Sequence, residues 1–116
     1  MRLRTDVWVA AYRARLEAEG IHAHIVAKGD ASAGDVLVKL AFMNDVASLF
    51  SRAPATFGPP AWVAEIEGRA EAEVDALVAR RRARDRDLWV IEVEDPRGRH
   101  LLDAPGIADT LGAGWP

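Results

Sequence analysis

The chain opens with hydrophobic residues at helical spacing. Thr5 and Asp6 are typical of a helix start and Gly20 of a helix end, so the pattern predicts a helix from about residue 5 to 19. At about 100° per residue, bulky side chains gather on one side, namely Trp8, Val9, Tyr12 and Leu16. Small ones gather on the opposite side, namely Val7, Ala10, Ala11, Ala14 and Ala18. Such a helix usually lies between two layers, so we expect the sheet to cover one side and the C-terminal tail or a second subunit to cover the other.

Four segments with alternating hydrophobic and polar residues follow, which is the pattern of β-strands. They are residues 21–28, 35–42, 46–51 and 62–67. Turn-forming residues predict a hairpin at 28–34 between the first two strands and a tight hairpin at 43–45 between the next two. Three prolines predict a surface loop before the fourth strand.

The remaining sequence predicts a second helix and a fifth strand. Val74, Leu77 and Val78 recur at helical spacing within residues 69–84, and residues 88–94 alternate again. A turn at 95–98 should let residues 99–103 return as a short edge strand. The Gly- and Pro-containing residues 104–116 are expected to form a mobile tail.

The order helix, four strands, helix, strand predicts a single α+β domain over residues 1–103. We expect a mainly antiparallel sheet of about five strands, with both helices packed on one face. The other face should be half exposed to water. It should carry the polar strand residues His22, His24, Lys39, Glu92 and Glu94.

Composition restricts the chemistry. The 116 residues include no cysteine, which excludes disulfides, thiolate metal sites and cysteine nucleophiles. The 15 basic and 18 acidic residues nearly balance, so no overall charge attracts nucleic acid. The hydrophobic run at residues 7–11 is too short for a signal-peptide core or a membrane span, so the default expectation is a cytoplasmic protein without membrane contact.

Three stretches carry a resemblance to known proteins: MRLRTDVWV at 1–9, KGDASAGDVLVKL at 28–40 and DRDLWVIEVEDPRGRHLL at 85–102. Together they resemble a family of small bacterial proteins catalogued as a domain of unknown function, number 1491, over about residues 1–103. Lys28 stands where that family usually has arginine, and Arg86 where it usually has proline. The resemblance implies a shared fold but no activity, cofactor or catalytic residue.

His22 and His24 are the first candidate for chemistry. They lie two residues apart on one predicted strand, so both imidazoles should face the same side, as some zinc sites require. His100 is the only other histidine, and no carboxylate stands beside the pair at fixed spacing. Two exposed polar strand residues are therefore the favoured interpretation, and a metal-dependent enzyme is the third hypothesis.

No serine lies in a Gly-x-Ser-x-Gly motif, and we expect neither catalysis nor a cofactor.

The densest charge cluster is RRRARDRD at residues 80–87. On a helical wheel, Arg80 and Arg84 fall on one flank and Arg82 on the other, so the arginines form no continuous stripe for phosphates. Arg81 falls on the apolar face, one turn before Asp85, its expected partner. The alternative hypothesis is an RNA- or anion-binding module that uses Arg82, Arg84, Arg86, Arg97 and Arg99.

The leading hypothesis is a non-catalytic protein-interaction module that self-associates as a homodimer. It rests on the first helix, whose bulky face one sheet cannot cover. The expected contact surface consists of Trp8, Tyr12, Leu16 and, from the tail, Trp115.

Overall fold

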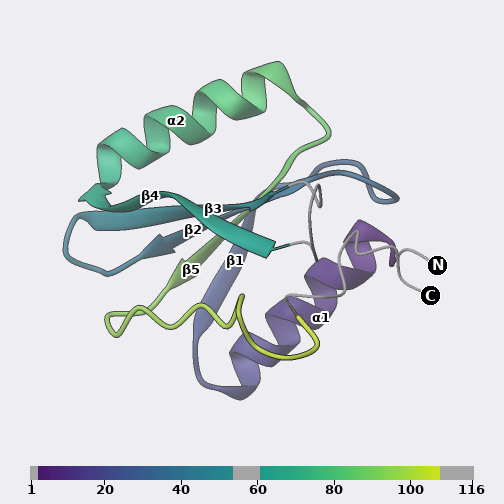
Figure 1. Cartoon of the computed structure of the whole chain (residues 1–116), viewed down its shortest axis with the longest axis horizontal. Helices are drawn as coiled ribbons and strands as arrows, with labels where there is room; N and C mark the ends of the chain where they lie inside the picture. Colours follow the sequence, from purple (N-terminus) through teal and green to yellow (C-terminus); the bar gives the residue numbers. More distant parts are fainter. Residues whose placement is uncertain (1–2, 54–60, 108–116) are drawn as a thin grey trace.

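A computed structural model describes residues 3–53 and 61–107, which form two helices and one five-stranded sheet (Figure 1). In chain order the elements are α1 (Thr5–Ala18), β1 (His22–Ala27), β2 (Val36–Ala41), β3 (Val46–Ala53), β4 (Ala61–Ala70), α2 (Glu71–Arg84) and β5 (Trp89–Glu94). The predicted α+β class and order of elements are confirmed. Neither helix is long and apolar enough to span a membrane.

The sheet is mixed, with the spatial order β1-β5-β2-β3-β4. Strands β2, β3 and β4 form an antiparallel series, and β1 is antiparallel to β5. The exception to the expected antiparallel pairing is central, because β5 runs parallel to β2, with Ile91 opposite Val38. The chain leaves β4 through α2 and re-enters the sheet between β1 and β2, so α2 is the crossover helix that a parallel connection requires.

The expectation that both helices share one face is wrong, because α1 and α2 lie on opposite faces of the sheet (Figure 1). Successive side chains of a strand point to opposite faces of the sheet, and in β2 the side chains on both faces are packed in a core. Val36 and Val38 pack in the core beneath α1, whereas Leu37 packs with Val74 of α2. All six residues of β2 are consequently buried, as is typical of a strand covered by helices on both faces.

The connection between β2 and β3 is the predicted tight turn. Met43 and Asp45 both have a φ of 66°. The Phe42 amide donates a 3.0 Å hydrogen bond to the Val46 carbonyl and closes the turn. This local pattern could be predicted because both strands and their turn are contiguous in the sequence.

The predicted hairpin at 28–34 does not form, because β5 lies between β1 and β2. This loop instead crosses the start of β5. The Asp30 amide donates to the Asp87 carbonyl at 2.9 Å, and the Trp89 indole donates to the Asp30 carbonyl at 2.8 Å. A Cβ at Gly29 would lie 2.0 Å from the Asp87 oxygen, and one at Gly34 would lie 2.2 Å from it. Glycine is therefore needed at both positions for close approach of two backbones.

The bulky face of α1 is buried inside the chain. Trp8, Tyr12 and Leu16 are 2%, 1% and 0% exposed. Trp8 stacks on Tyr12 and on Trp62 of β4, with ring centroids 4.9 Å and 5.4 Å apart. These residues form core rather than the expected contact surface, and Trp115 lies outside the described residues.

Residues 101–107, which we call the closing segment, cover the end of this core. Ile107 is 4% exposed, and its carbonyl accepts a 3.3 Å hydrogen bond from the Trp8 indole. The predicted strand at 99–103 is wrong, because these residues form turns and irregular structure instead. The packed core therefore extends to residue 107, although the sequence assigned residues 104–107 to the tail.

Candidate metal centre

The face of the sheet under α2 is only partly covered. α2 packs mainly on β2, β3 and β4, and β1 with part of β5 stays open on that face. Ala23 and Ile25 of β1 turn toward the core under α1, so His22 and His24, which alternate with them, face the other way. Their side chains are 72% and 46% exposed. The predicted half-exposed polar face is confirmed at these positions.

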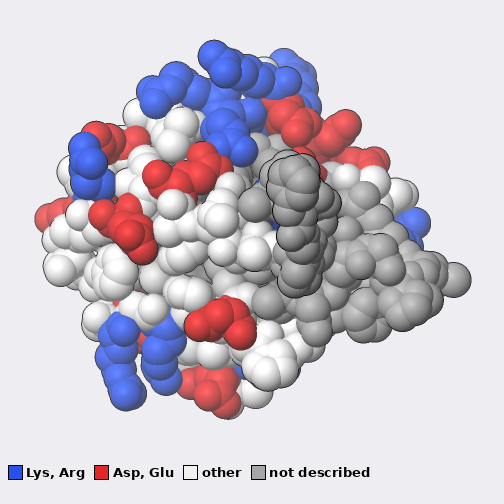
Figure 2. Space-filling view, in the orientation of Figure 1, with Lys and Arg blue, Asp and Glu red and all other residues white. Residues whose placement is uncertain are grey.

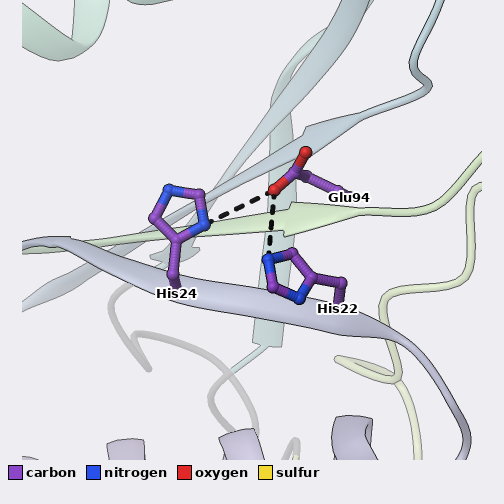
Figure 3. A group of neighbouring side chains, drawn as sticks. All are labelled: His22, His24 and Glu94. Atoms are coloured by element: carbon purple, nitrogen blue, oxygen red, sulfur yellow. Dashed lines mark ion pairs between the residues drawn. The ribbon is translucent and has the colours of Figure 1, made fainter.

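Glu94 of β5 reaches both imidazoles (Figure 3). Its Oε1 lies 3.5 Å from His22 Nε2 and 3.5 Å from His24 Nδ1. The three possible ligand atoms all lie within 4.8 Å of one another. Strand pairing produces this convergence, because His22 is directly opposite Glu94 in the β1–β5 ladder.

The spacing suits a small transition-metal ion. Zn²⁺ binds imidazole nitrogen at about 2.0–2.1 Å and carboxylate oxygen at about 2.0–2.2 Å, so its tetrahedral ligand atoms are separated by about 3.4 Å. Both distances from Glu94 are 3.5 Å. The exposed His22 ring is free to make the remaining adjustment. Two imidazoles and a carboxylate are donors that zinc and its neighbours in the first transition row accept.

Lys39 lies beside this group on the same face, and it is 5% exposed. Its Nζ lies 2.6 Å from Glu71 and 2.7 Å from Asp75, both on α2, and 3.2 Å from Glu92 on β5. Burial lowers the pKa of Lys39, but the hydrogen bonds to Asp75, Glu71 and Glu92 outweigh it and hold that pKa above its usual value. Lys39 is therefore a permanent cation that anchors α2 to the sheet.

Glu92 connects the two groups. It is directly opposite His24 in the β1–β5 ladder and directly opposite Lys39 in the β5–β2 ladder. Glu92, Glu71 and Asp75 are three carboxylates that face one ammonium group, and Glu94 adds a fourth carboxylate on the same face of the sheet. The surplus of negative charge favours a bound cation.

The candidate arginines are not brought together. Arg84 and Arg86 precede β5, whereas Arg97 and Arg99 follow it. The six residues of β5 hold the two pairs about 20 Å apart. Figure 2 shows basic side chains gathered over α2, with acidic side chains close beside them. The pair Arg84 and Arg86 therefore does not meet the pair Arg97 and Arg99 at one end of β5.

Several of these arginines already have structural partners. Arg82 donates to the Lys28 carbonyl at 2.8 Å. Arg81 contacts Glu65 of β4 at 2.6 Å, and this pair replaces the expected pair with Asp85. Arg99 contacts Asp95 at 2.9 Å, and this hydrogen bond holds the pKa of the Asp95 carboxyl below its usual value.

A separate cavity of about 460 Å³ lies between α1 and β1. Its lining consists of Ala10, Arg13, Ala14, Glu17, Ile21, His22 and Ala23. The alanines of α1 line it, and the outward face of α1 is exposed along its length, including Val7 at 47%. The small face of the first helix is thus the side that the described chain leaves uncovered.

Comparison with known proteins gives a family and a fold. The model of a family described as a protein of unknown function (DUF1491) matches residues 3–103. A crystal structure of a DUF1491 protein from Caulobacter crescentus CB15 is 42% identical, with a TM-score of 0.79, and the match covers 86% of this chain and 94% of that one.

Two further solved structures agree. An NMR structure of a DUF1491 protein from the same organism is also 42% identical, with a TM-score of 0.76 and coverage of 86% and 92%. A solution structure of a protein from A. tumefaciens is 29% identical, with a TM-score of 0.72 and coverage of 97% and 96%. No curated protein matches.

Proposed function

We propose that this chain, which belongs to the DUF1491 family of proteins of unknown function, is a binding protein for a divalent transition-metal ion of the zinc class. The ligands are His22, His24 and Glu94. The observation that supports the proposal is the convergence of both imidazoles on one carboxylate oxygen, at 3.5 Å each. Glu94 is the third ligand that the sequence pattern could not supply.

The surroundings favour a cation in this position. Three carboxylates already surround the ammonium group of Lys39 and Glu94 adds a fourth negative charge beside them, so a divalent ion relieves repulsion rather than adding to it. The strands fix the backbones of all three ligands, and only side-chain rotation is needed to close around an ion.

Titration calorimetry with Zn²⁺ and with Co²⁺ tests the proposal, using chelator-treated protein without a histidine tag. We expect one ion per chain. His24→Ala and Glu94→Gln should each weaken binding by at least about tenfold, because each removes a ligand. Glu67→Gln is the matched control, since it removes an exposed carboxylate on β4. Absence of binding by the unaltered chain, or equal binding by all variants, would refute the proposal.

A second proposal concerns self-association through the outward face of α1, with a second copy of the chain as the partner. It is favoured by the exposed Val7 and the exposed alanines that follow it, including Ala10 and Ala14. Small side chains let two helices approach closely. Sedimentation velocity over a wide concentration range should show a dimer that Ala14→Glu dissociates. A monomer at every concentration would end this proposal.

A further inference from the structure

We infer that Glu92 is the fourth ligand of the ion at His22, His24 and Glu94, and that it leaves Lys39 to bind the ion. The inference rests on the proposed metal site and deepens it. It turns a site with three ligands into a closed site with two imidazoles and two carboxylates.

The strand register places Glu92 at the missing corner of the site. His22 is opposite Glu94, and His24 is opposite Glu92, one pleat further along the same two strands. Residues directly opposite each other have Cβ atoms about 5 Å apart, and residues two apart on a strand share a face. The four side chains therefore occupy the corners of one rectangle on the open face of the sheet. Three of these side chains, those of His22, His24 and Glu94, already point toward one another, as Figure 3 shows.

The contacts of Lys39 explain how Glu92 becomes available. The distance from Lys39 Nζ to Glu92 is 3.2 Å, longer than the 2.6 Å and 2.7 Å to Glu71 and Asp75. Lys39 keeps two close carboxylates when Glu92 turns away, so its ammonium group stays compensated. Glu92 is 19% exposed and lies between the ammonium group and the imidazoles. Glu92 can therefore contact either the Lys39 ammonium group or the bound metal ion.

The fourth ligand changes the chemistry of the site. Zinc with four protein ligands is typical of closed structural sites, whereas catalytic zinc keeps one position open for water. With Glu92 bound, the ion has no position for a hydrolytic water. The site then holds a metal without catalysing a reaction, and the ion joins the edge strand β1 to the centre of the sheet.

Cobalt spectroscopy on the full chain tests the inference. Co²⁺ bound to the unaltered protein should show the intense visible absorption of a tetrahedral ion. Glu92→Gln should weaken Co²⁺ and Zn²⁺ binding by at least about tenfold and should reduce that absorption. Glu71→Gln is the matched control, because it removes the same charge from the Lys39 cluster without removing a proposed ligand. It should keep the tetrahedral spectrum.

The two proposals fail in different ways. If the unaltered chain binds Co²⁺ but Glu92→Gln keeps its affinity and spectrum, the inference about Glu92 is wrong and the site with three ligands stands. If Glu92→Gln and Glu71→Gln weaken binding equally and leave the spectrum unchanged, Glu92 acts only through its charge, and the inference is again wrong. If the unaltered chain binds no ion, the proposed function fails and the inference fails with it.

Discussion

The hydroxyl of Tyr12 donates a 2.7 Å hydrogen bond to the main-chain carbonyl of His100. This bond links the middle of α1 to the chain just before the closing segment. The His100 ring is held as well, because its Nδ1 accepts a 3.0 Å hydrogen bond from the Leu102 amide. One residue thus connects the first helix to the segment that covers the core.

Tyr12→Phe tests the first of these bonds. The substitution keeps the packing of the ring and leaves the His100 carbonyl without its donor, so the free energy of unfolding should fall by about 1–3 kcal/mol. Urea denaturation measures this loss, and hydrogen exchange at Leu102 should become faster. An unchanged denaturation midpoint would show that the bond does not stabilise the fold.

Acid should weaken the attachment at His100. Burial holds the pKa of His100 below its usual value of 6.5, although the Asp103 carboxylate acts in the opposite direction. The unfolded chain therefore takes up a proton before the folded chain does, and stability should decline as the pH falls below 6.5, until the lower folded pKa is passed. Protonation of Nδ1 also removes the acceptor for Leu102.

His100→Asn should remove this part of the pH dependence, because its side-chain oxygen can accept the same bond and does not titrate. Urea midpoints between about pH 7 and pH 5 measure the effect. Parallel pH profiles for the unaltered chain and His100→Asn would contradict the assignment.

Lys39→Met should destabilise the protein by about 2–4 kcal/mol, because Glu71, Asp75 and Glu92 then face one another without a cation. The loss stays below that of a fully buried pair, since Asp75 is 56% exposed and can be hydrated again. Arg81→Met is the control at a more exposed pair and should cost less than about 1 kcal/mol. Equal losses in thermal or urea unfolding would contradict the anchoring role of Lys39.

Gly29→Ala and Gly34→Ala should each cost at least about 2 kcal/mol, because the added methyl group overlaps the Asp87 carbonyl. Ser32→Ala in the same loop should have little effect, because the Ser32 side chain is exposed and its hydrogen bond with Arg4 is 3.4 Å long. Full stability of both alanine variants would show that the loop can move away from β5 without loss.

Local patterns predicted the elements of this fold well, because each depends on contiguous residues. The strands, both helices and the turn at Met43 follow from spacing and turn chemistry. The position of α2 on the opposite face could have been read from β2, where five of six residues are hydrophobic. Such a run is typical of a strand covered on both sides. The expectation of a mainly antiparallel sheet with helices on one face did not take this hydrophobic run into account.

Only part of the candidate metal centre could be predicted from the sequence. The spacing of His22 and His24 predicted a shared face, and alternation placed Glu94 on a face of its own strand. Their meeting depends on the pairing of β1 with β5, which are more than sixty residues apart. Strand alternation alone does not say which strands are neighbours, so the third ligand could not be identified from a single sequence.

The central position of β5 also determines when the protein can fold. The last strand of the described residues lies between β1 and β2, so β1 has no neighbour in the sheet until residues 89–94 are available. During synthesis, β2, β3 and β4 can pair early, whereas β1 must wait for residues 89–94. A chain that stops before β5 therefore lacks more than one strand. It also leaves β1 without a neighbouring strand.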